Sequence, residues 1–142
     1  MDLLDLRERF PAAPDYLSNM YLIERDYGEV SNRRLAAWMG VSAPAASQAV
    51  NRLKALDLVE QAPYGRARLA SPGRELALVV LKRHYLLEHL LVRVLGYPWE
   101  KADDEAHVLQ NYLSRDLVEH LDDFLGHPHA CPHGNPLPGT AR

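Results

Sequence analysis

Cysteine is almost absent from this chain. Its 142 residues include a single cysteine, Cys131, so no disulfide can form within the chain, which favours a reducing compartment. No uninterrupted apolar run approaches the roughly 20 residues that a membrane-spanning helix requires. The first residues, MDLLDLRERF, are acidic and lack the basic and then apolar order of a signal peptide. We therefore expect a cytoplasmic protein with no membrane partner.

The sequence also lacks the short motifs by which many enzymes are identified. It contains no glycine-rich phosphate loop, no nucleophile elbow and no HExxH pair. Asp103, Asp104 and Glu105 form a run of acids, but acids at the start of a helix are explained more simply by the helix dipole. We predict that the protein is not an enzyme.

Charge is unevenly distributed along the chain. The whole sequence has a formal net charge of -3, whereas residues 31–74 hold seven Lys and Arg against two acidic residues, a net charge of +5. The remainder therefore carries about −8, so a basic segment is joined to an acidic one. A basic segment of this kind is typical of a module that contacts nucleic-acid phosphates.

Two helices separated by a tight turn are predicted within the basic segment. The first has Ser31 or Asn32 as its N-cap and ends at Gly40, and the second follows the N-cap Ser42 with Pro44 in its first turn. The side chains expected to face inward are Leu35, Trp38, Met39, Ala46, Val50, Leu53 and Leu56. Helix, short turn and helix in this order are typical of a DNA-reading helix-turn-helix.

A β-hairpin is predicted directly after the second helix. Residues 58–60 and 67–69 read as two short strands around Tyr64, Gly65 and Arg66. A hairpin with an arginine at its tip, beside a helix-turn-helix, is a wing. An earlier helix is predicted over residues 14–27, and the first dozen residues show no period, so we expect a flexible arm there.

The second half of the chain is predicted to be helical. A long helix starts at Ser71 and ends at Gly96, and shorter helices follow over 103–114 and 115–125, the last with Ser114 as its cap. The long helix carries more apolar residues than one side of a small domain needs, which indicates a bridge between modules or a dimer interface. The expected dimer contacts are Leu87, Leu90, Leu91, Val94, Leu117 and Leu121.

The exposed face of the second helix of the helix-turn-helix carries side chains suited to DNA. Gln pairs with adenine, Ser meets phosphates or base edges, and Pro meets thymine methyl groups. We predict that the major groove is read by Ser42, Pro44, Ser47, Gln48 and Arg52, and that Arg66 contacts the backbone. The alternative, from a different class, is a dimeric interaction module that uses the same fold without binding DNA.

The stretch DDEAHVLQNYLS, residues 103–114, places polar side chains on one face of a predicted helix. Asp103, His107 and Asn111 lie one turn apart, and Gln110 joins them. Carboxylate and imidazole are good ligands for transition metals, whereas the two amides are poor ones. The row therefore indicates either part of a metal site or a helix with an ordinary polar face.

Several segments in a fixed order resemble the diphtheria toxin repressor and manganese transport regulator family of metal-dependent transcription factors. They are DYLSNMYLIE, LAAWMGVSAPAASQAVNRLKALDLVE, SPGRELALVVLKRHYLLEHLL, DDEAHVLQNYLS and FLGHPHACPHGNPLP. The resemblance covers nearly the whole chain, from about Asp15 to Pro138, and it is the combination that is specific.

The resemblance implies a mostly α fold in which an N-terminal winged helix-turn-helix is followed by an all-helical dimerisation domain. We place these domains at residues 1–74 and 75–142. It also implies a homodimeric regulator, most simply a repressor of metal-homeostasis genes, that binds double-stranded DNA at a palindromic operator when Mn²⁺ or Fe²⁺ binds where the domains meet. Some members continue into a small β-barrel domain after the segment that corresponds to GNPLP.

The resemblance also implies a set of metal ligands. They are Asp15, His84, Glu88, Asp103, His107, Gln110 and Asn111. Hard oxygen ligands favour Mn²⁺ over Fe²⁺. Ser18 stands where manganese-type members often have glutamate, and Gln110 and Asn111 stand where the family usually has Glu and His.

These departures divide the expected metal centre in two. His84, Glu88 and Asp103, with or without His107, retain the ligands for one ion. The other site, built from Asp15, His107, Gln110 and Asn111, has lost its charge-bearing core, because Gln110 and Asn111 replace the usual Glu and His. The alternative is a regulator of the same shape in which the metal site has degenerated, so that the amides make ordinary hydrogen bonds and no metal is needed.

The segment HPHACPH suggests a zinc site at first sight. Its residues His127, His129, Cys131 and His133 lack the spacing of common zinc motifs, and two prolines stiffen it. We therefore expect a connecting loop there.

Overall fold

The computed structural model describes residues 1–62 and 65–129. The chain divides into two compact units, Met1–Leu78 and Val79–Arg142. Both are dominated by helices, with one two-stranded sheet in the first unit. Among the described residues, no helix is both long and apolar enough to cross a membrane.

The first unit opens with two helices, α1 (Leu3–Arg9) and α2 (Ala13–Tyr27). The expected flexible arm is wrong, because α1 is capped by the Asp2 side chain and buries Leu3 and Leu6. Seven residues are too few to show a clear apolar period, and packing against the core stabilises so short a helix. As predicted, Gly28 ends α2, with a φ of 82° that glycine adopts without strain.

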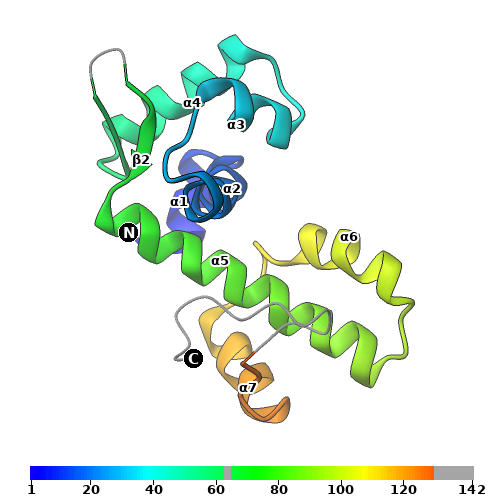
Figure 1. Ribbon diagram of the computed structural model, residues 1–142. Coiled ribbons are helices and arrows are strands. Elements are labelled where there is room, and N and C mark those ends of the chain that lie inside the picture. The colour runs from blue at the N-terminus through cyan, green and yellow to red at the C-terminus, as the bar shows by residue number, and fades with distance from the viewer. Residues whose placement is uncertain (63–64, 130–142) are drawn as a thin grey trace. The chain divides into compact units, whose positions relative to one another are not determined.

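The helix-turn-helix consists of α3 (Asn32–Met39) and α4 (Ala43–Ala55), coloured cyan to turquoise in Figure 1. Ser31 and Ser42 are the N-caps, each accepting a backbone N–H at 3.2 Å, and Gly40 ends α3 in the left-handed region at φ 66°. The prediction that Trp38 faces inward is wrong, since 41 % of it is exposed. In so short a helix the core reaches only Leu35 and Ala36 fully.

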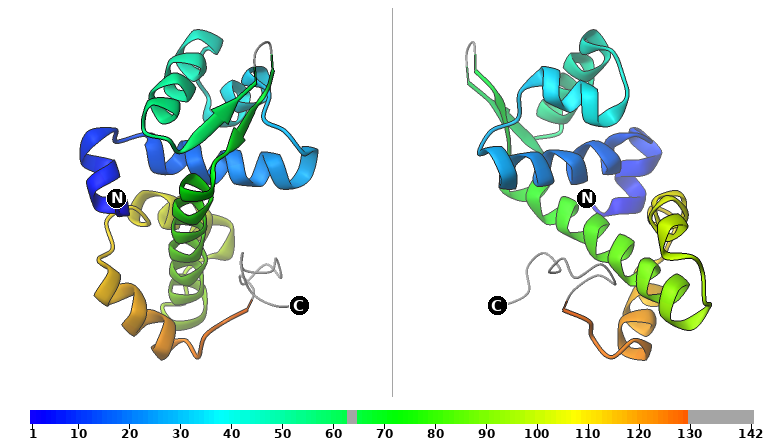
Figure 2. Two further views of the ribbon diagram at one scale, coloured as in Figure 1. Left: turned by 90° about the vertical axis from the view of Figure 1, so that its left-hand side faces the viewer. Right: turned by 45° about the vertical axis from the view of Figure 1, so that its right-hand side comes forward.

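The predicted hairpin is confirmed, with β1 at Val59–Gln61 and β2 at Ala67–Leu69. The strands pair antiparallel with Glu60 opposite Arg68, and Figure 2 shows them side by side. Val30 forms a further bridge with Ala67, which the sequence pattern did not indicate.

A largely buried carboxylate, that of Glu24, connects this sheet to the helices of the first unit. Glu24 of α2 accepts the backbone N–H of Leu69 at 3.1 Å and pairs with the Arg74 guanidinium at 2.6 Å. Bonds of this kind, with an ionised partner, are stronger than neutral ones. Arg74 of the basic segment therefore has a structural partner.

The boundary between the units falls within α5 (Ser71–His89). The long helix was predicted to run to Gly96, but its last turn is the π-helical η1 (Leu90–Val94), closed by the Leu95 N–H to Leu90 O bond at 3.0 Å. A π turn adds an extra residue to one turn of the helix, and the spacing of apolar residues in the sequence does not indicate where this happens. Gly96 then turns the chain at φ 67°.

Two helices complete the second unit, α6 (Trp99–Leu109) and α7 (Arg115–Phe124). The helix predicted from 103 begins four residues earlier and ends at Leu109, so Asp103 lies in its middle and Asn111 in the turn beyond it. Ser114 caps α7 as predicted.

The core of the second unit corrects part of the predicted dimer interface. Leu87, Leu91 and Leu121 are buried within their own chain, in two clusters that include Ala102, Ala106, Leu86 and Val118. Leu90 packs against the second cluster, whereas Val94 and Leu117 are exposed. The apolar excess of the long helix is thus largely used within the protomer.

Candidate DNA-binding surface and metal centre

One face of α4 packs on the core, and the opposite face is exposed. Ala46, Ala49, Val50 and Leu53 are buried, and the opposite face exposes the residues predicted to read DNA. Those exposed residues are Ser42, Pro44, Ser47, Gln48 and Arg52. Because residues three and four apart share a helical face, this surface matches the one that enters a major groove in helix-turn-helix proteins.

Asn51 belongs to the same surface and was missed by the sequence interpretation. It is exposed and lies three residues after Gln48 and four after Ser47, so helical spacing alone would have identified it. Asn, like Gln, can form a bidentate pair with adenine.

Arg52 makes contacts within the protein. Its guanidinium lies 4.1 Å from the centre of the Phe10 ring and donates from Nη2 to the Arg9 carbonyl at 2.9 Å. The side chain therefore connects α4 to the end of α1. Contacts of this kind are structural, and they set Arg52 apart from Gln48.

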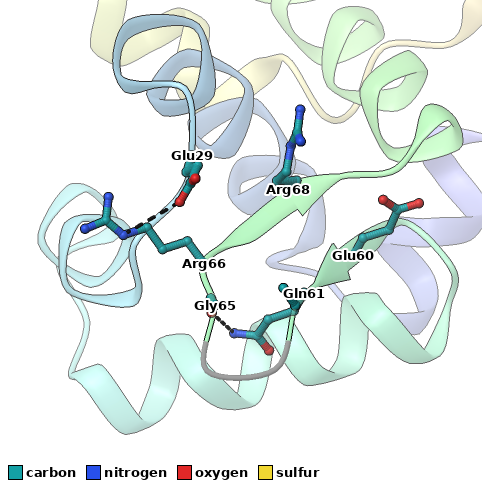
Figure 3. Close-up of a pocket in the computed structure, with 7 residues that line it drawn as sticks. Glu29, Glu60, Gln61, Gly65, Arg66 and Arg68 are labelled. Carbon is teal, nitrogen blue, oxygen red and sulfur yellow. Dashed lines mark hydrogen bonds and ion pairs between the residues drawn. The ribbon is translucent and has the colours of Figure 1, made fainter.

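The wing carries two exposed arginines beside a shallow hollow (Figure 3). Arg66 approaches Glu29 with its Nε 3.8 Å from the carboxylate, at a position where both side chains are more than half exposed. Arg68 projects from the face of β2 opposite to buried Ala67 and Leu69. An exposed ion pair at this distance contributes little to stability, so Arg66 can exchange its partner for a phosphate.

Three potential metal ligands converge in the second unit. His84 Nε2 lies 2.5 Å from Glu88 Oε1 and 2.8 Å from Asp103 Oδ1. Successive turns of α5 place His84 and Glu88 together, and α6 contributes Asp103. Their ligand atoms all lie within 4.8 Å of one another. Glu88 is almost fully buried and Asp103 is exposed, so the cluster has a solvent-facing side.

Gln110 occupies the other edge of the His84 ring. Its Oε1 lies 2.6 Å from His84 Nδ1, and Gln110 itself is 2 % exposed. The structure thus separates the two ring nitrogens, because Nε2 faces two carboxylates and Nδ1 faces a neutral amide.

The surroundings of His84 raise its pKa above the usual 6.5. Burial of the ring is the largest single effect and lowers the pKa. Four effects raise the pKa and together outweigh burial: the hydrogen bond to Glu88, the charge of Glu88, the hydrogen bond to Gln110 and the charge of Asp103. The protonated ring donates from both nitrogens to these oxygens. A site that attracts a proton between carboxylates has the charge to attract a cation.

Of the remaining predicted ligands, His107 and Asn111 belong to the second unit and Asp15 to the first. Asp15 is in the first turn of α2 in the first unit, and His107 is exposed on α6, one turn beyond Asp103. Asn111 is 8 % exposed in the turn after α6. Within the described part of the chain, the residues with metal-ligand geometry are His84, Glu88 and Asp103.

The histidine-rich segment begins at the end of α7. His127 contacts Asp122 at 2.9 Å through Nδ1 and Asp123 at 3.2 Å through Nε2. Both of its ring nitrogens are therefore engaged with the helix that precedes it. Cys131 and His133 lie outside the described residues.

Comparison with known proteins gives two family matches in the same order as the two units. Residues 10–67 match the model described as "Iron dependent repressor, N-terminal DNA binding domain". Residues 71–139 match "Iron dependent repressor, metal binding and dimerisation domain".

Individual relatives agree with these matches. The chain is 34 % identical over 138 residues to the iron-dependent repressor IdeR of Mycobacterium leprae, covering 97 % of the chain and 57 % of that protein. It is 33 % identical over 142 residues to the diphtheria toxin repressor of Corynebacterium diphtheriae, covering 97 % and 58 %. The chain therefore spans just over half the length of these relatives.

Solved structures share the fold. A manganese-dependent transcriptional repressor in complex with manganese matches with a TM-score of 0.83 and 40 % identity, over 90 % of the chain and 59 % of that structure. The manganese regulator SloR matches with a TM-score of 0.78 and 37 % identity, over 92 % and 60 %. The winged helix-turn-helix followed by a helical domain, predicted from the sequence, is thereby confirmed.

Proposed function

The chain belongs to the iron-dependent repressor family, and from this premise we propose that it is a homodimeric transcriptional repressor, located in the cytoplasm, whose DNA binding responds to Mn²⁺ or Fe²⁺. The observation that carries the metal response is the His84, Glu88 and Asp103 cluster, in which one imidazole and two carboxylates have ligand atoms within 4.8 Å of one another. A buried carboxylate beside a histidine also occurs in purely structural pairs, so the proposal rests on all three groups converging.

The donor set fits a hard divalent ion. Two carboxylates neutralise the charge of Mn²⁺ or Fe²⁺, and a neutral imidazole is an accepted ligand for both. Oxygen donors outnumber nitrogen, and the three groups contain no thiolate, which favours Mn²⁺. A bound ion supplies positive charge that draws α5 and α6 together at this point.

Gln110 and Asn111 indicate a single-ion centre. Both amides are buried, and neither brings the charge that a second divalent ion requires. We propose that the centre retains one ion per chain, held by His84, Glu88 and Asp103.

The exposed face of α4 is proposed to read DNA. Ser42, Pro44, Ser47 and Gln48 face the major groove, and Arg66 contacts a phosphate from the wing. Arg52 was predicted for the same surface and is proposed to act chiefly by holding α1 against α4. Two copies of this surface in a homodimer match a palindromic operator, because a twofold axis in the protein requires one in the DNA.

Calorimetric titration of Mn²⁺ into the metal-stripped protein tests the metal response. We expect saturable binding of about one ion per chain, lost in His84→Ala and unchanged in the control His120→Ala, which alters an exposed histidine on α7. Absence of saturable binding to the parent protein up to millimolar metal would contradict the proposal. The chain would then be a metal-independent winged-helix regulator.

A further inference from the structure

We propose that Gln110 is a positioning residue that fixes which nitrogen of His84 binds the metal ion. This inference rests on the proposed metal response and assigns a role to a side chain that stands where the family usually has a ligand. In this role Gln110 contacts His84 and leaves the ion to His84, Glu88 and Asp103.

The geometry around the ring supports this role. Gln110 Oε1 is 2.6 Å from Nδ1, whereas the carboxylate oxygens of Glu88 and Asp103 are 2.5 and 2.8 Å from Nε2. The two nitrogens lie on different edges of the imidazole. An ion bound by Nε2 and the two carboxylates therefore lies on the edge of the ring away from Gln110 Oε1.

The chemistry of the two groups is complementary. A neutral imidazole carries one N–H and one lone pair, and only the nitrogen with the lone pair can bind a metal. An amide oxygen accepts hydrogen bonds, so Gln110 stabilises the form with the proton on Nδ1. Nε2 then presents its lone pair toward Glu88 and Asp103. A hydrogen-bond partner on the second nitrogen also restricts rotation of the ring.

Gln110 is well held for such a role. Its backbone N–H donates to the Ala106 carbonyl at 2.9 Å, which fixes it at the end of α6. The side chain is almost fully buried, so water does not compete for the bond. A neutral acceptor has a further consequence, because it orients the ring without adding a negative charge that would recruit a second ion.

The first test is Mn²⁺ affinity measured by calorimetry on metal-stripped protein. Gln110→Met keeps the size of the side chain but removes the acceptor, and loss of such a partner typically weakens binding by roughly 10–100-fold. Gln110→Glu keeps an acceptor and is expected to bind at least as tightly as the parent. Gln61→Met, the same substitution at an exposed strand position, is expected to leave the affinity unchanged.

The second test observes the ring directly. In ¹⁵N-labelled protein loaded with diamagnetic Zn²⁺, we expect His84 to show a metal-shifted Nε2 and a slowly exchanging Nδ1–H. In Gln110→Met the Nδ1–H is expected to exchange rapidly with water, while circular dichroism shows the same helix content. If Gln110→Met only lowered the stability of the protein, the His84 Nδ1–H would still exchange slowly in the folded molecules.

The outcomes separate this inference from the proposed function. Equal Mn²⁺ affinities in the parent and in Gln110→Met, or coordination of the metal through Nδ1, would overturn the role of Gln110 while leaving the metal response intact. Failure of the parent protein to bind Mn²⁺ would overturn the metal response and the role of Gln110 with it.

Discussion

At the scale of single residues, the chemistry of His84 differs from that of an exposed histidine. The ring is largely buried, and its two nitrogens lie 2.5 to 2.8 Å from three side-chain oxygens. Its spacing of four residues from Glu88 was visible in the sequence, but such pairs are common on helices. The contact between His84 and Asp103 of α6 depends on how the two helices pack. It therefore could not be predicted from the spacing of residues within α5.

The raised pKa of His84 predicts how stability depends on pH in the metal-free protein. A pKa that is higher in the folded state than in the unfolded state contributes stability that is fully present below the unfolded value of about 6.5. That contribution is lost as the pH rises through the folded pKa. The difference in free energy of unfolding between the parent and His84→Gln, from urea denaturation, should therefore be largest near pH 6 and decrease toward pH 9. A difference that grows with pH would contradict this assignment.

Gln48 and Arg52 are one helical turn apart, yet the structure predicts different consequences for their loss. Gln48→Ala should weaken binding to the specific operator by about 1–3 kcal/mol, the usual value of a bidentate base contact, with no change in stability. Arg52→Ala removes the stacking on Phe10 and the bond to the Arg9 carbonyl. It should lower the midpoint of thermal unfolding.

Fluorescence anisotropy with operator and scrambled duplexes, together with thermal denaturation, distinguishes the two effects. Ser47→Ala, at a neighbouring exposed position, serves as the comparison variant. It shows how much the loss of a small polar group on the same face changes the operator affinity and the thermal midpoint. If Arg52→Ala lost only sequence-specific affinity and kept its thermal midpoint, Arg52 would be a base-reading residue, as the sequence first suggested.

At the scale of helices and strands, several boundaries that a serine cap or a glycine marks were predictable from the sequence. Ser31, Ser42 and Ser114 cap their helices as expected, and Gly28 and Gly40 end theirs. No comparable signal marks the start of α6, where Pro98 is the N-cap without a side-chain hydrogen bond. The π turn η1 was also not predicted, because its residues are as apolar as those of the α-helix that it continues.

The apolar face left exposed on α7 predicts where the second protomer binds. Leu117 and Phe124 lie seven residues apart, two helical turns, and Phe124 is 70 % exposed. Such residues are unusual on a free surface when they align on one face. Because the matched family domain is a dimerisation domain, we predict that Leu117→Glu with Phe124→Glu shifts the protein from dimer to monomer in sedimentation velocity.

A matched control for the α7 variant is available on the same helix. Glu119 is exposed and pairs only loosely with Arg115, at 3.8 Å, so Glu119→Gln changes charge without touching the apolar face. It should leave the sedimentation coefficient unchanged. A double variant that remained dimeric would place the interface elsewhere, for example around the exposed Trp99 of α6.

At the scale of the whole molecule, the order of modules was easier to predict than the composition of the metal centre. The helix-turn-helix and the hairpin follow from local signals, namely caps, turn residues and alternation. The cluster of His84, Glu88 and Asp103 combines residues from two helices, and the resemblance to known regulators suggested them together with four others. The proposed role of Gln110 could not be predicted from the sequence. A side chain that binds a metal ion and a side chain that hydrogen-bonds to a metal-binding histidine occupy similar places in a sequence.

The proposed function connects the metal centre and the DNA-reading surface through a thermodynamic linkage that is necessarily reciprocal. If saturating Mn²⁺ raises operator affinity by some factor, saturating operator DNA must raise Mn²⁺ affinity by the same factor, and typical factors are roughly 5–150. We predict this equality when operator affinity is measured by anisotropy with and without Mn²⁺, and Mn²⁺ affinity by calorimetry with and without the duplex. His84→Ala should bind operator with one affinity in both conditions, because it removes the imidazole ligand. Operator binding by the parent protein that ignores Mn²⁺, despite a filled metal centre, would mean that the ion stabilises the fold without controlling DNA binding.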